Sequence, residues 1–94
     1  MYVVVAQWTA RPGQEATVEA VLREMTPITR AEPGCVGFVV HRAIDNPRLF
    51  VLYEQFTDEA AFEAHKASEP FKQHVLGRAV PLLERRERVF CEPI

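Results

Sequence analysis

The chain has 94 residues and a formal net charge of −2, without the basic footprint that a nucleic-acid partner requires. Hydrophobic residues make up 48% and charged residues 26%, which is typical of a globular protein, and no apolar run approaches the roughly 20 residues of a membrane helix. Two cysteines without metal-ligand spacing and the lack of a signal-peptide pattern predict one reduced, cytoplasmic domain over residues 1–94.

Residues 2–10 (YVVVAQWTA) are rich in β-branched and aromatic side chains, which predicts a first strand. Both faces of this strand are largely apolar, with Tyr2, Val4, Ala6 and Trp8 on one and Val3, Val5, Gln7 and Thr9 on the other. A strand that is apolar on both faces is normally covered on both. We therefore expect a partner chain to cover the face that the helices of this chain leave open.

A turn at residues 11–13 is followed by a predicted helix over residues 14–31. Its apolar residues recur at helical spacing and predict a core-facing stripe of Val18, Val21, Leu22, Met25 and Ile28. Pro27 removes a backbone donor inside this pattern, which predicts a kink or an early end of the helix. Pro33 and Gly34 then stop the helix, and Gly34 is a candidate for a positive φ.

Residues 35–44 and 49–56 predict two strands joined by a hairpin turn at residues 45–48 (DNPR), so the two strands are antiparallel. In the later strand, Glu54 shares a face with Phe50, Leu52 and Phe56. A carboxylate among apolar neighbours requires a partner or a raised pKa. The alternative is a rim position, where Glu54 meets a basic residue or water.

Asp58 predicts the cap of a helix over residues 59–67, and Ser68 caps a second short helix with Pro70 in its first turn. Residues 82–91 (LLERRERVFC) predict a last strand, whose consecutive charges indicate an edge or intersubunit position. The order strand, helix, strand, strand, helix, strand is that of the ferredoxin-like split βαβ arrangement, an α+β fold with a four-stranded antiparallel sheet.

Several short motifs follow one another along the chain: Arg30-x-Glu32-Pro33-Gly34-Cys35, Phe50-x-x-x-Glu54-x-Phe56-x-Asp58, Ala61, His65, Ser68 and Phe71. This ordered set resembles the antibiotic biosynthesis monooxygenase family over nearly the whole chain. One departure is Phe56, where members of the family more often carry tryptophan. The resemblance implies a homodimeric α/β barrel. It also implies a small enzyme, without cofactor or metal, that oxidises a quinol-like or polyketide aromatic substrate with molecular oxygen.

Such an oxidation requires an apolar pocket, a base near the phenol and polar groups that hold the oxygens. The candidate catalytic residues are His65, which matches a recurrent histidine of the family and ordinarily titrates near neutrality, and Glu54. The alternative for His65 is structural, with its ring hydrogen-bonded to Glu54 or to a backbone carbonyl. The candidate substrate-binding residues are Trp8, Phe38, Phe56, Phe62, Phe71 and His74, although His74 also fits a surface or interface position, as does His41.

Tyr53 faces away from Glu54 and therefore toward the expected dimer interface. We expect Arg85, Arg86 and Arg88 to form a solvated or intersubunit run of charge. Cys35 and Cys91 are interpreted as small buried hydrophobic residues rather than nucleophiles.

Three other functions stay open. The first is an isomerase of a small hydroxyketone or its phosphate, an activity known in a relative of this fold group, although the segment is rich in acid and a phosphate favours a basic pocket. Haem degradation is a second, with His74 as the iron ligand. It is disfavoured because the corresponding enzymes carry tryptophan where His65 stands and asparagine near Ala6 and Gln7. The third is a dimeric small-molecule-binding module without catalysis.

Overall fold

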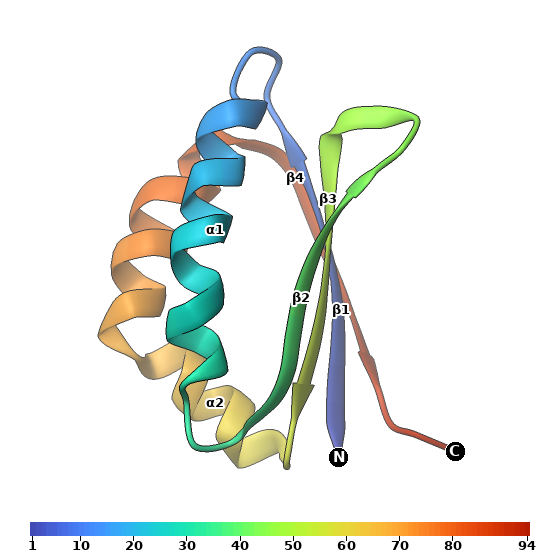
Figure 1. Cartoon of the computed structure of the whole chain (residues 1–94), viewed down its shortest axis with the longest axis vertical. Helices are drawn as coiled ribbons and strands as arrows, with labels where there is room; N and C mark the ends of the chain where they lie inside the picture. Colours follow the sequence, from blue (N-terminus) through green and yellow to red (C-terminus); the bar gives the residue numbers. More distant parts are fainter.

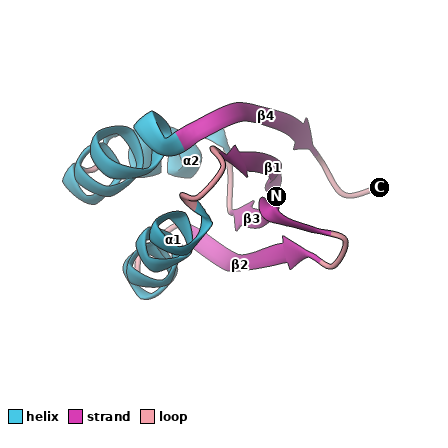
Figure 2. Cartoon of the chain, turned by 90° about the horizontal axis from the view of Figure 1, so that it is seen from above, coloured by secondary structure: helices cyan, strands magenta, loops and turns pink.

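The computed structural model describes all 94 residues, from Met1 to Ile94. Four antiparallel strands form one sheet in the order β2-β3-β1-β4, and the helices cover one face of it (Figure 1, Figure 2). The strands are β1 (Tyr2–Ala10), β2 (Cys35–Ala43), β3 (Asn46–Phe56) and β4 (Leu83–Cys91). The helical elements are α1 (Glu15–Arg30), α2 (Glu59–Ala67), the π-helix η1 (Phe71–Ala79) and the 3₁₀ turn η2 (Val80–Leu82). This is the predicted ferredoxin-like α+β fold.

The central strand β1 hydrogen-bonds to β3 on one side and to β4 on the other, so β4 is the edge strand that its charges predicted. The helix-facing side chains of β1, including Val4, Ala6 and Trp8, are buried. On its opposite face Val3 is buried, Val5 is half-buried and Gln7 is exposed. A single chain therefore covers only one face of the sheet, and cover for the other face stays a prediction about an assembly.

Helix α1 differs from its predicted course in two ways. Pro27 neither ends nor interrupts it, and α1 continues to Arg30. Because Pro27 has no backbone N–H, the carbonyl of Arg23 lacks its usual hydrogen bond within the helix. Arg23 is exposed, so water can satisfy this carbonyl instead. In addition, the core-facing stripe ends on Thr29, which is fully buried, whereas Ile28 is exposed. Eleven residues make close to three full turns, so Thr29 returns to the face of Val18 and Ile28 does not.

The hairpin between β2 and β3 is tighter than predicted. Its turn is at residues 44–45, and β3 already begins at Asn46, whose side-chain Oδ1 accepts a hydrogen bond from the Arg48 backbone N–H at 3.1 Å. At the other end of the hairpin, a register shift between Cys35 and Gly37 pairs Cys35 with Phe56. Strict alternation would place Cys35 on the same face as Gly37, away from the core. The bulge breaks this alternation, and Cys35 packs against the core.

The segment after β3 follows the predicted caps. Asp58 Oδ1 accepts a hydrogen bond from the backbone N–H of Ala61 at 2.8 Å, and Ser68 Oγ accepts one from that of Phe71 at 3.3 Å. The second helix of this segment is a π-helix, η1, in which the Val80 N–H reaches back five residues to the Val75 carbonyl. π-Helices are rare and occur often at functional sites.

Gly34 has a different role from the one that the sequence suggested. Only Gly13 has a positive φ. At Gly34, a Cβ atom would lie 2.3 Å from the Cβ of Ala61, so the loop between α1 and β2 packs directly on α2. The Thr57 backbone N–H donates to the Gly34 carbonyl at 2.9 Å and ties the loop to the end of β3. No helix of the fold combines the length and apolarity that crossing a membrane requires.

Candidate functional site

Glu54 stands in the middle of the sheet, on the face that the helices cover. It lies on β3 between Val4 of β1 and Phe38 of β2, and it is 5% exposed. This is a buried position, not the rim position that was its alternative. Burial raises the pKa of Glu54 to about 7, against the opposing effect of the Arg88 and Arg86 charges. Near neutral pH this carboxyl group can therefore both give and take a proton.

His65 extends from α2 toward Glu54 and is buried. Its Nδ1 lies 2.7 Å from Oε1 of Glu32, and its Nε2 lies 3.9 Å from Oε1 of Glu54, beyond hydrogen-bond distance. A carboxylate only accepts, so Nδ1 donates to Glu32, and in the neutral form of the ring Nε2 carries the lone pair, on the Glu54 side. The structural alternative expected the ring to hydrogen-bond to Glu54 or to a backbone carbonyl. Its partner is instead the carboxylate of Glu32.

Glu32 is a candidate site residue that sequence reasoning missed. It lies in the loop between α1 and β2, and its side chain is 22% exposed, so it connects the buried imidazole to solvent. The close contact of Gly34 with Ala61 holds this loop on α2, the helix that carries His65. The signal was present, since Glu32 belongs to the Arg30-x-Glu32-Pro33-Gly34-Cys35 motif, but that motif alone assigns no partner to its carboxylate.

Aromatic rings surround the imidazole of His65. The ring centroids of Phe71, Phe56, Phe62 and Phe38 lie 5.1, 5.3, 6.2 and 6.4 Å from that of His65. Such an environment excludes water and strengthens the electrostatic interaction of the two acid–base groups. Four of the predicted substrate-binding aromatics therefore gather at the predicted catalytic pair.

A small cavity lies against this pair, and an open groove lies outside it. The cavity has a volume of about 20 Å³, room for one water molecule, and its lining includes Trp8, Glu54 and His65. The groove, between α2, η1 and β4, has a volume of about 400 Å³. Phe71, Arg86 and Arg88 line both spaces and therefore stand between them.

Arg85, Arg86 and Arg88 of β4 are all exposed, as expected of a solvated run, but two of them also face the candidate site. Arg86 pairs with Trp8 and Arg88 with Ala6, so both project toward the helices and the cavity. Arg85 alternates to the opposite face and forms an ion pair with Glu87. The guanidinium carbon of Arg86 lies 5.9 Å from the Trp8 ring centroid, and burial lowers the pKa of Arg86. The period-two alternation of a strand separates Arg86 and Arg88 from Arg85, and the pairing with β1 decides which face meets the helices.

Three other candidates lie elsewhere or differ in burial. His74 lines neither the cavity nor the groove; its Nδ1 is 3.6 Å from Glu24 Oε2 and 3.1 Å from Arg78 Nη1. Cys35 is half-buried, and burial together with the charge of Glu32 raises the pKa of its thiol, which disfavours the thiolate. Cys91 is exposed, so its interpretation as a buried hydrophobic residue was wrong. No cluster of three or more His, Cys, Asp or Glu side chains has the arrangement of a metal site.

The sequence profile of the antibiotic biosynthesis monooxygenase family matches residues 1–75. A relative from Mycobacterium tuberculosis, Rv0793, is named as a candidate monooxygenase and is 32% identical over 65 residues, which cover 69% of this chain and 63% of that protein. The match thus spans less than two thirds of the length of that relative.

Solved structures show the same fold. PA3566 from Pseudomonas aeruginosa is 31% identical with a TM-score of 0.91, over 99% of this chain and 93% of that one. A crystal structure described as an antibiotic biosynthesis monooxygenase is 27% identical with a TM-score of 0.93, over 100% of this chain and 99% of that one. With the profile match over most of its length and a buried acid–base pair on the shared fold, this chain belongs to the antibiotic biosynthesis monooxygenase family.

Proposed function

We propose that the protein is a cofactor-independent monooxygenase that oxidises a quinol-like or polyketide aromatic substrate with molecular oxygen. Membership of the family supports the monooxygenase class. The observation that carries the proposal for this chain is the buried pair of Glu54 and His65 under an aromatic shell, 3.9 Å apart at their nearest polar atoms. This pair can deprotonate a phenol in an environment that favours reaction of the anion over its hydration.

In the proposed mechanism, the lone pair of His65 Nε2 takes the phenolic proton, and Glu32 stabilises the resulting imidazolium through Nδ1. The phenolate then supplies electrons to oxygen. One oxygen atom enters the ring and the other leaves as water: a phenol and O2 give a quinone and water, and a quinol and O2 give a hydroxyquinone and water. Because the substrate is oxidised by four electrons, the reaction balances without another reductant.

Arg86 and Arg88 are proposed to attract the anionic form of the substrate. Their guanidinium groups line the groove and the cavity, close enough to Glu54 to lower its pKa against the effect of burial. The cavity of about 20 Å³ is too small for a ring, whereas the groove of about 400 Å³ accommodates one. We therefore propose that the ring first lies in the groove and reaches Glu54 when Phe71 and the two arginines move apart.

Oxygen uptake tests this proposal. With a panel of quinols and polyketide phenols, wild type should consume oxygen, and labelled O2 should place one heavy atom in the product. His65→Ala and His65→Gln should lose about 100-fold or more in kcat/KM, while Glu69→Gln, an exposed carboxylate that lines neither the cavity nor the groove, serves as the control. Equal uptake by wild type and both His65 variants would remove His65 from the mechanism. No uptake above the blank on any substrate would favour the non-catalytic binding module.

One observation favours a second candidate, the isomerase of a hydroxyketone or its phosphate. The acid-rich segment disfavoured a phosphate, but Lys66, Arg86 and Arg88 give the groove three cationic side chains against one carboxylate, Glu63. The same acid–base pair could move a proton next to a carbonyl. Under anaerobic conditions an isomerase would still exchange substrate hydrogen with deuterated water and form product, whereas the monooxygenase would form none.

We also propose that the protein is a homodimer joined through the open face of its sheet. On that face a row of apolar side chains crosses all four strands: Val39, Tyr53, Val5 and Val89 are consecutive cross-strand partners. Val39, Tyr53 and Val89 are 43%, 40% and 61% exposed in the single chain. A continuous apolar row of this kind is rarely left to solvent.

Light scattering tests the dimer. Wild type should have twice the mass of the chain at micromolar concentration, and Tyr53→Glu should shift it toward the monomer. Ala60→Glu places the same charge on the exposed side of α2 and should leave the mass unchanged. A monomeric wild type at that concentration would contradict the proposal.

A further inference from the structure

A second cleft lies between α1 and the edge strand β2, away from the acid–base pair. Its volume is about 360 Å³, within the range of small-molecule pockets, and of the residues that line the inner cavity it shares only Leu22. Its floor is apolar, with Leu22 and Phe50 buried and Val40 half-buried. This cleft combines an apolar floor with a strongly charged wall.

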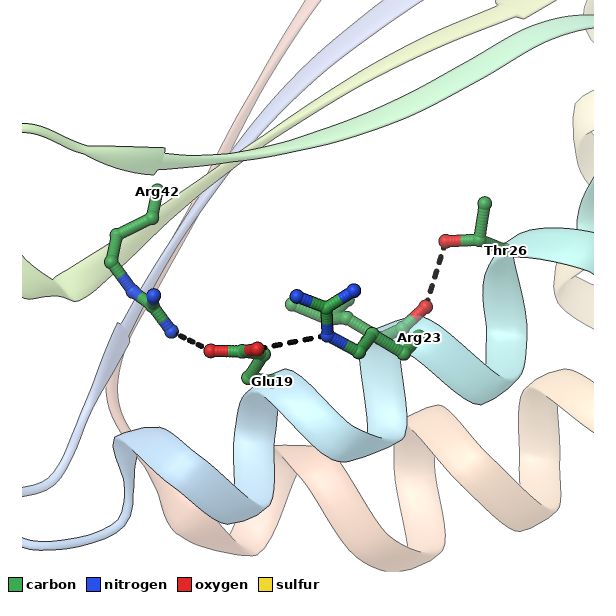
Figure 3. A network of polar contacts seen from close by, with 5 residues as sticks. Glu19, Arg23, Thr26 and Arg42 are labelled. Atoms are coloured by element: carbon green, nitrogen blue, oxygen red, sulfur yellow. Dashed lines mark hydrogen bonds and ion pairs between the residues drawn. The ribbon is translucent and has the colours of Figure 1, made fainter.

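The charged wall has an excess of positive charge. Three guanidinium groups, those of Arg23, Arg30 and Arg42, line the cleft against one carboxylate, Glu19. The carboxylate bridges two of them: Arg23 Nε donates to Glu19 Oε2 at 2.8 Å, and Arg42 Nη2 donates to Glu19 Oε1 (Figure 3). Arg23 and Arg42 thus already bind a carboxylate of the chain itself in this cleft.

Two of the three arginines are held in place by other contacts. Arg30 Nε donates to the backbone carbonyl of Phe38 at 2.9 Å, which leaves its terminal nitrogens available. The guanidinium of Arg42 lies over the ring of Phe50, 5.2 Å from its centroid. A guanidinium that is already oriented loses less entropy when it binds a carboxylate, and its planar fork matches that group. Arg30 and Arg42 are therefore prepared for an anion in a way that freely exposed arginines are not.

We propose that this cleft binds a small organic carboxylate with a flat apolar body. The ligand carboxylate takes the place of Glu19 against Arg42 and also contacts Arg30, while its apolar part lies on Leu22, Val40 and Phe50. Glu19 then acts as an internal competitor that occupies Arg42 in the absence of ligand. The occupant is assigned to this class because an inorganic anion would not use the apolar floor and a neutral ring would not use the guanidinium groups.

Isothermal titration calorimetry with benzoate tests the proposal on the full-length protein. Benzoate should bind saturably and more weakly at high salt, and benzamide, its neutral isostere, should not bind. Arg42→Gln should weaken benzoate binding about tenfold, the loss of a charge-assisted hydrogen bond. Glu19→Gln should tighten it by several-fold, because the internal competitor is gone. Arg78→Gln, an exposed arginine outside the cleft, should leave the affinity unchanged, and circular dichroism confirms that each variant is folded.

A different set of results would overturn the proposal. The groove at the acid–base pair also carries arginines, so Arg86→Gln separates the two places. If Arg86→Gln abolishes benzoate binding and Arg42→Gln does not, the ligand occupies the groove. If inorganic phosphate binds as tightly as benzoate, the apolar floor contributes nothing. Unchanged binding in Glu19→Gln would refute the role of Glu19. None of these outcomes depends on oxygen uptake, so failure here leaves the proposed oxidation untouched.

Discussion

Glu54 and Glu19 are the same side chain in two opposite environments. Glu54 lies under the helices with two arginines nearby, and burial raises its pKa to about 7. Glu19 lies at the surface in direct contact with two arginines, and the hydrogen bonds from Arg42 and Arg23 lower its pKa. The comparison teaches that arginines near a carboxylate do not by themselves decide its protonation. Direct contact and solvation decide it, so the buried Glu54 suits proton transfer and the surface Glu19 suits ion pairing.

The largest effect is expected from Glu54→Gln. The folded state binds the Glu54 proton more tightly than the unfolded state, whose pKa is the ordinary 4.5. The stability of wild type should therefore fall as pH rises from about 4.5 to about 7 and change little above that. Glu54→Gln lacks this loss, so it should be more stable than wild type by up to about 3 kcal/mol at pH 8, with no such gain at pH 4. Urea unfolding over this pH range measures the difference; a gain independent of pH would contradict the raised pKa.

Gly34→Ala should have the next largest effect. Its Cβ would lie 2.3 Å from that of Ala61, so α2 must shift, at a cost of about 2 kcal/mol in the free energy of unfolding. The same shift should separate Glu32 from His65 and lower kcat. In a double-mutant cycle, Ala61→Gly should recover part of the lost stability, because it removes the opposing atom. Strictly additive effects of the two substitutions would show that this contact does not hold the loop on α2.

Arg88→Gln should raise the pKa of Glu54 further. The Arg88 charge lowers that pKa more than the Arg86 charge does, so its removal should raise the pKa further above its value of about 7. Carbon NMR of the Glu54 carboxyl group during a pH titration measures the midpoint. Arg85→Gln is the matched control, because Arg85 projects to the opposite face and pairs with Glu87. A midpoint that moves equally in both variants would indicate a general charge effect rather than this geometry.

The smallest effect is expected from Glu19→Gln, and it has the opposite sign. The folded-state pKa of Glu19 is lowered, so its ion pairs stabilise the fold above pH 4.5, and this contribution is lost as pH falls through the folded value. Because Glu19 lies at the surface, where solvent screens its ion pairs, Glu19→Gln should lose only a little stability at pH 7 and none at the acidic end. Thermal unfolding at pH 7 and pH 3 measures it. If Glu19→Gln lost as much stability at pH 7 as Glu54→Gln gains at pH 8, solvent would not screen the ion pairs of Glu19 as expected.

Local patterns in the sequence predicted the fold and the position of Glu54 at the candidate site. The alternation around Glu54 placed it on one face with Phe50, Leu52 and Phe56, and all four are buried. The caps at Asp58 and Ser68 predicted both helix starts, and the order of elements predicted the ferredoxin-like sheet. These features depend on backbone geometry within a few residues, so a linear pattern contains them.

Only the tertiary structure decided what those residues meet. Glu32 and His65 are 33 positions apart, and a contact of Gly34 with Ala61 brings them together. The pairing of β4 with β1 turns Arg86 toward Trp8, which a run of charges did not reveal. The pKa of Glu54 likewise depends on how completely the helices exclude water from it. Partners and solvation follow from packing between distant segments, because that packing sets the distances and the dielectric environment on which the chemistry of a carboxylate depends.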